Sequence, residues 1–127
     1  MKTMLIADDQ VIIDMLRAQS RILPENLIIM QSSKDPLDVM STICASNPSL
    51  LIVDDDFLKP HTARILKSVR KLLSACQIIF LTSDASLELG REVSQLGIQY
   101  YAYKPLEKNE LIESLESILK LNIQRKA

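Results

Sequence analysis

The chain of 127 residues contains only two glycines, Gly90 and Gly97. A phosphate-binding loop or a dinucleotide-binding turn needs several glycines close together, so both are excluded. Tryptophan is absent and aromatic residues make up 4% of the chain, which is too little for a base-stacking surface. The net charge of −1 at pH 7 provides no overall field toward nucleic acid or an acidic membrane.

Residues that ligate soft metals are also scarce. His61 is the only histidine, and Cys44 and Cys76 are the only cysteines. A zinc site needs about four nitrogen or sulfur ligands, so this chain could hardly assemble one. Both cysteines have apolar neighbours, and we expect them to be reduced residues of the core.

Long hydrophobic runs and linkers are missing as well. The first apolar stretch, Met4–Ala7, meets Asp8 at once, which is too short for a signal peptide or a membrane span. We therefore expect a cytoplasmic protein without membrane contact. No repeat or low-complexity segment divides the chain, so one domain over 1–127 is predicted.

What the sequence does contain is an alternation of strand and helix patterns. Short apolar runs typical of buried parallel strands occur at Met4–Ala7, Leu27–Met30, Leu50–Val53, Ile78–Leu81 and Tyr100–Tyr103. Helical stripes fill the intervals. Five strand–helix repeats predict an α/β fold, a five-stranded parallel sheet that is doubly wound in the flavodoxin-like manner.

The helical stripes contain specific signals. The first stripe runs from Ile12 to Leu23, and Asp35 before Pro36 is typical of a helix N-terminus. Gly97 is a good left-handed residue to end the fourth helix. The buried faces of the second and third helices are predicted to comprise Leu37, Met40, Ile43 and Cys44, and Ile65, Leu66, Val69, Leu72 and Leu73.

Polar residues follow four of the five strands. They are Asp8 and Asp9; Asp54, Asp55 and Asp56; Thr82, Ser83 and Asp84; and Lys104 and Pro105. The carboxyl ends of parallel strands meet at one edge of a sheet, where ligands bind. Crowded carboxylates there raise pKa values or recruit a cation, and oxygen ligands favour Mg²⁺. With a lysine and a hydroxyl opposite, such a site can stabilise phosphoryl transfer onto a carboxylate.

In this order and spacing, these residues resemble the receiver domains of two-component response regulators, over essentially the whole chain. The resemblance identifies Asp8 and Asp9 with the family's acidic pair and Asp54 with its phosphoacceptor. Further matches are Thr82 with the family's Ser/Thr, Lys104-Pro105 with its Lys-Pro pair, usually joined by a cis peptide bond at Pro105, and Tyr101 with the switch aromatic.

The resemblance implies a mechanism. A histidine kinase or a phosphotransfer protein would donate the phosphoryl group to Asp54. Mg²⁺ would be bound by Asp9, Asp54 and the backbone carbonyl of Asp56, with Asp8 acting mainly through water. Thr82 and Lys104 would hold the acyl phosphate. Movement of Thr82 would let Tyr101 turn inward and change the surface of the fourth helix, fifth strand and fifth helix.

The resemblance also implies an output. We expect a stand-alone signalling module that is not an enzyme acting on other substrates and does not bind nucleic acid directly. It would act through its changed surface on an unknown downstream protein, and the same surface could form a homodimer.

The chain departs from the family after Asp54. Proline is usual four residues after the acceptor and glycine eight after, but Leu58 and Thr62 stand there, and Pro60 comes at plus six. Choosing Asp56 as acceptor would place Pro60 at plus four. We favour Asp54 because it ends the apolar run and because side chains alternate along a strand.

Two alternative functions stay open at this point. The altered loop would suit a pseudo-receiver, which has the same fold but docks without being phosphorylated. A Mg²⁺-dependent phosphohydrolase could use Asp54 and Asp56, although Phe57-Leu58 lack the threonine expected after the second aspartate.

Overall fold

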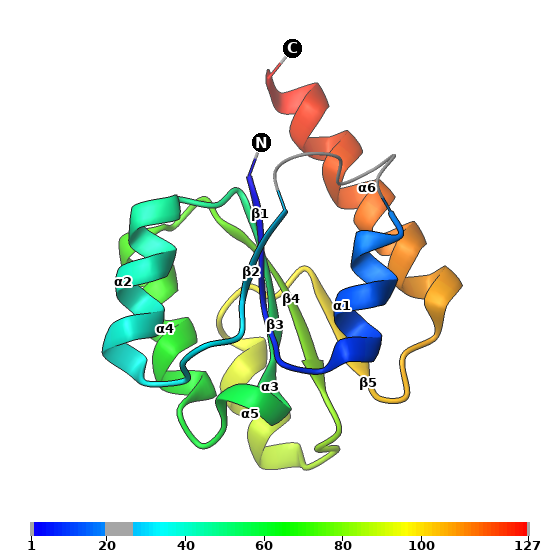
Figure 1. Ribbon diagram of the computed structural model, residues 1–127. Coiled ribbons are helices and arrows are strands. Elements are labelled where there is room, and N and C mark those ends of the chain that lie inside the picture. The colour runs from blue at the N-terminus through cyan, green and yellow to red at the C-terminus, as the bar shows by residue number, and fades with distance from the viewer. Residues whose placement is uncertain (1, 20–26, 127) are drawn as a thin grey trace.

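The computed structural model describes residues 2–19 and 27–126, with side chains to Leu119 (Figure 1). The strands are β1 (Thr3–Ile6), β2 (Leu27–Met30), β3 (Leu50–Asp54), β4 (Gln77–Thr82) and β5 (Tyr100–Tyr103). The helices are α1 (Gln10–Arg17), α2 (Pro36–Ser46), α3 (Asp55–Leu58), α4 (Thr62–Leu72), α5 (Leu87–Ser94) and α6 (Lys108–Lys126). The predicted contribution of Leu23 to the first helix lies outside the described residues.

The strands form one parallel sheet in the order β2-β1-β3-β4-β5. The predicted fold class is confirmed. The order reverses between β1 and β3, which is the switch point where doubly wound sheets bind their ligands. The prediction of one helix per strand omitted α3, whose four residues are too few to show a helical period. The predicted fourth and fifth helices are therefore α5 and α6.

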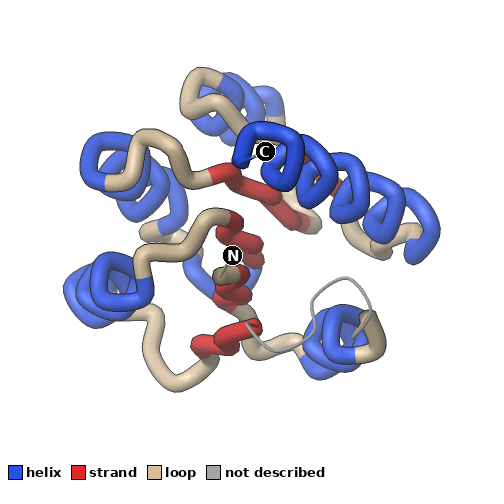
Figure 2. Tube along the Cα trace, turned by 90° about the horizontal axis from the view of Figure 1, so that it is seen from above, coloured by secondary structure: helices blue, strands red, loops and turns tan. Residues whose placement is uncertain are grey.

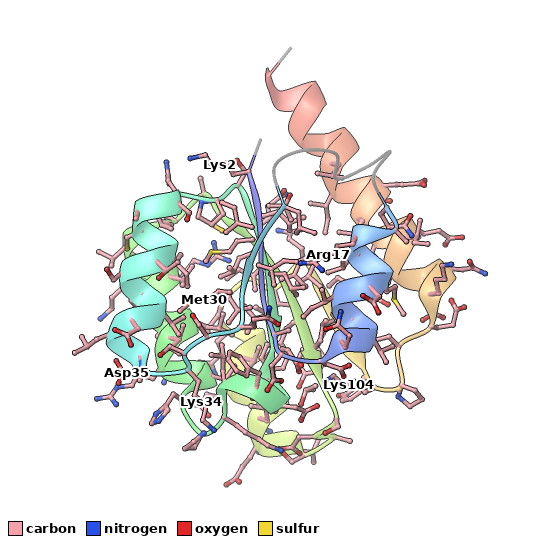
Figure 3. The ribbon with its side chains drawn as sticks, viewed as in Figure 1. Lys2, Arg17, Met30, Lys34, Asp35 and Lys104 are labelled. Carbon is pink, nitrogen blue, oxygen red and sulfur yellow. The ribbon has the colours of Figure 1, made fainter. Side chains whose placement is uncertain are left out.

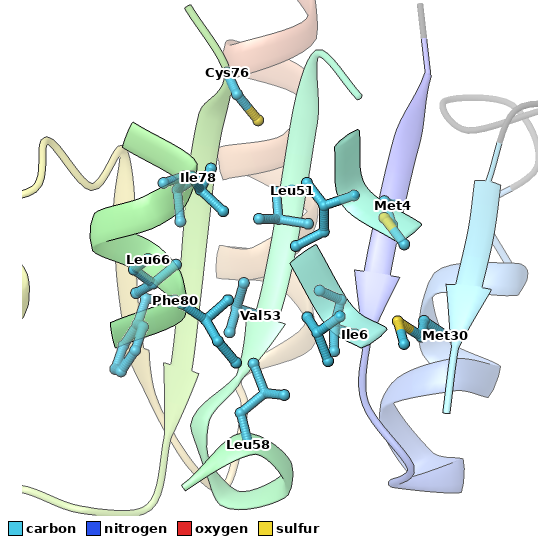
Figure 4. Packing of buried hydrophobic residues seen from close by; sticks show 14 of the residues in the cluster. Met4, Ile6, Met30, Leu51, Val53, Leu58, Leu66, Cys76, Ile78 and Phe80 are labelled. Atoms are coloured by element: carbon cyan, nitrogen blue, oxygen red, sulfur yellow. The ribbon is translucent and has the colours of Figure 1, made fainter. Parts of the chain in front are cut away.

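Helices lie on both sides of the sheet (Figure 2). Because side chains alternate along the strands, two hydrophobic layers form, one on each face. Helices α2, α3, α4 and α5 pack on one face, against side chains such as Ile6, Val53 and Phe80 (Figure 4). Helices α1 and α6 pack on the other face, against side chains such as Ile52 and Leu81. Burying each such side chain contributes about 1.5–3 kcal/mol, so both layers stabilise the sheet.

Local signals fix the ends of two helices. The carboxylate of Asp35 accepts a hydrogen bond from the Asp38 amide at 3.2 Å, with Pro36 opening α2. Gly97 follows α5 with φ +69°, a left-handed conformation that favours glycine. The predicted start of α2 is confirmed, and Gly97 is left-handed as predicted. The predicted helix end is wrong, because α5 ends at Ser94 with Gln95 as its C-cap, three residues before Gly97.

Parts of the predicted buried faces are wrong. Leu37 is 82% exposed and Cys44 is also exposed, whereas Val39 and Ile43 form the buried face of α2. Leu37 and Cys44 lie seven residues apart and so share one face, which the helix turns to solvent. Leu72, at the end of α4, is 64% exposed. In the described residues, no helix is long and apolar enough to cross a membrane.

Candidate functional site

The strand ends bring an acidic cluster around one lysine. Lys104, directly after β5, lies at the lower edge of the molecule in the view of Figure 3. Its ammonium Nζ lies 2.9 Å from each carboxylate oxygen of Asp54. The same atom lies 3.1 Å from Asp56 Oδ2 and 3.6 Å from Asp9 Oδ2. Three elements, β3, α3 and the β1–α1 turn, thus supply carboxylates to one cation.

The position of Asp54 follows from strand alternation. Leu50 and Ile52 pack in the α1/α6 layer, and Asp54, two residues further, turns its side chain to the same side of the sheet. Its side chain is 1% exposed. One oxygen accepts a hydrogen bond from the Asp56 amide at 3.1 Å, and both contact Lys104. The carboxylate is therefore aimed into the cluster rather than into the apolar core.

Burial and charge act against each other in this cluster. Burial raises the pKa of Asp54 above 3.8, although the hydrogen bond from Lys104 works to lower it. Burial works to lower the pKa of Lys104, but its hydrogen bonds to Asp54 and Asp56 outweigh burial, so its pKa is raised. Lys104 therefore stays positively charged at neutral pH.

Asp56 holds the outer side of the cluster. Its carboxylate accepts a hydrogen bond from Ser83 Oγ at 2.7 Å and forms ion pairs with Lys104 and, at 3.5 Å, with Lys59. Burial works to raise the pKa of Asp56, but the hydrogen bonds from Ser83 and Lys104 and the two lysine charges lower it. Asp56 thus links α3, which follows β3, to Ser83, which follows β4.

Thr82 lies at the same edge, but its hydroxyl is engaged elsewhere. Ile78 and Phe80 pack in the opposite layer from Asp54, and Thr82 follows that alternation. Its Oγ1 donates to Asp55 Oδ2 at 2.8 Å and accepts from the Asp84 amide at 2.9 Å. Thr82 and Asp55 are both buried.

Tyr101 is partly buried in this structure. Its ring packs against the same layer as Thr82, 4.9 Å from the Phe80 ring between centroids. Its hydroxyl is buried and forms no hydrogen bond with the described residues. Burial, followed by nearby charges that include those of Tyr103 and Asp55, raises the pKa of Tyr101 to about 12.

The two aspartates after β1, Asp8 and Asp9, have different surroundings. Asp9 caps α1, with one carboxylate oxygen accepting from the Val11 amide at 2.9 Å, and its other oxygen faces Lys104. Asp8 is exposed beside it. The Lys104–Pro105 peptide bond is cis, and so is Lys59–Pro60.

The donor set of the cluster fits Mg²⁺ in its chemistry. Asp9, Asp54 and Asp56 offer only oxygen atoms as ligands. Both oxygens of Asp54 and one oxygen each of Asp9 and Asp56 lie within 3.6 Å of the Lys104 ammonium. Mg²⁺ typically binds one or two carboxylates and keeps several waters, so it needs no complete protein cage. Among the described residues, no three acidic, histidine or cysteine side chains are already arranged to coordinate a metal ion. Waters would therefore have to complete the coordination of Mg²⁺ here.

Sequence reasoning located the cluster but not its internal pairings. It anticipated Asp9, Asp54, Thr82 and Lys104 at one edge. For Asp56 it proposed a backbone carbonyl ligand and left open the roles of alternative acceptor and of second aspartate in a phosphohydrolase. It did not anticipate the contacts of the Asp56 side chain or the Asp55–Thr82 bond. Strand alternation was the available signal for the Asp55–Thr82 contact. Asp54 of β3 is the register partner of Leu81 of β4, so the next residues, Asp55 and Thr82, are also neighbours.

Solved structures share this fold. The response regulator receiver domain protein (CheY-like) from Methanospirillum hungatei JF-1 has a TM-score of 0.78 at 21% identity, with 98% of each chain covered. The signal receiver domain of a putative Luxo repressor protein from Vibrio parahaemolyticus has a TM-score of 0.78 at 18% identity, covering 98% of this chain and 94% of that one.

A curated relative is longer than this chain. The uncharacterized transcriptional regulatory protein YesN of Bacillus subtilis (strain 168) is 21% identical over 118 residues, which are 93% of this chain and 32% of that protein. The chain thus spans about a third of its length. The sequence model of the response regulator receiver domain matches residues 4–116. The chain therefore belongs to the response regulator receiver domains, the signalling domains of two-component systems in which an aspartate accepts the phosphoryl group.

Proposed function

We propose that residues 1–127 act as a receiver domain that accepts a phosphoryl group on Asp54. The observation that carries this proposal is the contact of both Asp54 oxygens with Lys104 at 2.9 Å, in a nearly buried site at the switch point of the sheet. A buried carboxylate beside a fixed cation is a nucleophile placed next to the charge that will stabilise its product.

The donor would be a phosphohistidine of a histidine kinase or a phosphotransfer protein. An Asp54 oxygen attacks the phosphorus and forms an acyl phosphate. The phosphorus–nitrogen bond breaks, and the imidazole nitrogen keeps the electron pair. Lys104 balances charge on the transferred oxygens, and the Thr82 hydroxyl holds one of them.

Residues for Mg²⁺ are Asp9, Asp54 and the backbone carbonyl of Asp56, with Asp8 through water. When bound, the ion would offset negative charge between the carboxylate and the phosphoryl oxygens. The chain's own contribution is to hold these oxygens at one edge through the capped start of α1 and the turn from β3 into α3.

The signal would leave through the face formed by α5, β5 and α6. Leu87, at the start of α5, is 75% exposed, and Tyr103, at the end of β5, is 52% exposed. Large apolar side chains in this exposed position suit a protein partner, which could be a second copy of the domain. Rearrangement of Thr82 and Tyr101 would alter this face.

The test is incubation with Mg²⁺ and acetyl phosphate, followed by intact-mass measurement. The proposal expects one acid-stable, base-labile phosphoryl adduct on the wild type, which disappears in Asp54→Asn and without Mg²⁺. A pseudo-receiver would give no adduct in either protein. A phosphohydrolase would release phosphate from a broad substrate over many turnovers.

A further inference from the structure

The hydroxyl of Thr82 already has its single proton committed inside the protein. It donates to Asp55 Oδ2 at 2.8 Å and accepts from the Asp84 amide at 2.9 Å. A hydroxyl carries one proton, so it cannot donate to a group on Asp54 while it donates to Asp55. Thr82 must break the Asp55 bond before it can hold a phosphoryl oxygen.

The Asp55–Thr82 bond is well protected. Asp55 is 3% exposed and Thr82 is 0% exposed. In the described part of the chain, Thr82 is the only side chain that donates a hydrogen bond to the Asp55 carboxylate. A hydrogen bond to a carboxylate is roughly twice as strong as one between neutral groups, and water does not compete for it when it is buried.

The backbone gives the bond a fixed geometry. Asp54 and Leu81 are partners in the β3–β4 register, and Asp55 and Thr82 are the next residues on each strand path. Asp54 and Asp55 therefore point to opposite faces of the sheet, one toward Lys104 and the other toward Thr82. In this structure Thr82 bonds to Asp55 and makes no hydrogen bond to Asp54, so it would have to leave Asp55 to reach a group carried by Asp54.

We propose that Asp55 is a positioning residue that holds the Thr82 hydroxyl away from Asp54, so that phosphorylation must displace this bond before the switch can move. This inference rests on the proposed function of Asp54. It makes Asp55 a determinant of how readily the phosphorylated arrangement forms, without any contact between Asp55 and the phosphoryl group.

The test measures the affinity of Mg²⁺ with beryllofluoride, a phosphoryl mimic, by fluorine NMR. Asp55→Leu removes the acceptor and frees Thr82. We expect about tenfold tighter binding than in the wild type, the low end of what one hydrogen bond to a charged group contributes. Asp55→Asn keeps a neutral acceptor, and its affinity should lie between the two. Circular dichroism checks that each variant is folded, and Asp55→Asn carries the test if Asp55→Leu does not fold.

A double-mutant cycle separates the bond from the field of the Asp55 charge. Loss of the negative charge of Asp55 would by itself strengthen binding of the anionic beryllofluoride mimic, whether or not residue 82 has a hydroxyl. In the Thr82→Val background, the gain from either Asp55 substitution should therefore be lost or much reduced. An equal gain in both backgrounds, or no gain in the wild-type background, overturns the role of Asp55. If no variant binds the mimic, the proposed function and this inference both fail.

Discussion

Lys104 places one positive charge against three carboxylates in a partly buried site. Its side chain is 17% exposed, and that of Asp54 is 1% exposed. A cation in this position stabilises the metal-free protein, but it also neutralises the carboxylates that would hold Mg²⁺. The same residue should therefore act in opposite directions on stability and on metal affinity.

We predict that Lys104→Met lowers the free energy of unfolding by about 3 kcal/mol without metal, because Asp54 is left buried and unpaired. Magnesium should bind this variant about tenfold more tightly, because the competing ammonium is gone. Denaturant unfolding and calorimetric Mg²⁺ titration measure the two effects.

Lys59→Met is the matched control for this prediction. Within the described residues, the Lys59 ammonium forms one ion pair, with Asp56 at 3.5 Å, and its side chain is 57% exposed. Its loss should therefore cost less than about 0.5 kcal/mol. Equal losses in the two variants would show that Lys104 is not the central cation of the cluster.

The two cysteines are predicted to differ in reactivity. Burial raises the pKa of Cys76 from 9.0 to about 11, whereas Cys44 is exposed. The thiolate is the reactive form, and the folded protein favours the protonated Cys76 thiol, so stability is lost as the pH rises from 9.0 toward 11.

With a thiol reagent at pH 7.5, we expect Cys44 to react at once and Cys76 only on unfolding. Peptide mass mapping with and without denaturant, and again at rising pH, distinguishes the two sites. Rapid labelling of both cysteines in the native protein at pH 7.5 would contradict the burial of Cys76.

At the scale of the elements, one side chain of α4, Arg70, binds the α4–β4 loop and the α5–β5 loop. The Arg70 guanidinium donates to the carbonyls of Leu96 at 2.8 Å, Cys76 at 2.8 Å, Ser74 at 2.9 Å and Gly97 at 3.2 Å. These acceptors lie before β4 and between α5 and β5. Arg70 therefore fixes the starts of the two strands whose other ends carry Thr82 and Lys104.

Arg70→Lys should lower the free energy of unfolding by about 1–3 kcal/mol, because an ammonium cannot reach four carbonyls in a planar arrangement. Arg64→Lys, an exposed position on the same helix, should change it by less than about 0.5 kcal/mol. Denaturant midpoints give both values. If the two substitutions have the same effect, the Arg70 contacts contribute nothing specific.

At the same scale, α3 shows where the sequence was least informative. Its four residues, Asp55–Leu58, occupy the loop in which the chain departs from the family's proline and glycine positions. A single turn of helix shows no periodicity, so only the three-dimensional structure reveals that Asp54 caps it and that Asp55 turns toward Thr82.

For the whole molecule, the sequence was enough to predict the sheet. Short apolar runs separated by helical stripes typically form a parallel sheet with helices on both faces. In this fold the polar residues that follow each strand gather at one edge of the sheet. That logic placed Asp54 and Lys104 together. It could not choose which carboxylate binds which donor, because Asp54, Asp55 and Asp56 are chemically identical and differ only in the direction their side chains take.

The direction of those side chains is also what the central claim depends on. Asp54 faces Lys104 from β3, Asp55 faces Thr82 on the other side of the sheet, and Asp56 reaches Lys104 from the first turn of α3. Only Asp54 combines burial, both oxygens on the cation and the switch-point position.

The most direct measurement is to locate the acyl phosphate in the phosphorylated wild-type protein. Borohydride reduces an aspartyl phosphate to homoserine, and peptide sequencing by mass spectrometry then identifies the modified position among the three adjacent aspartates. The account predicts homoserine at position 54 alone. Homoserine at position 55 or 56, or at none of the three, would contradict it.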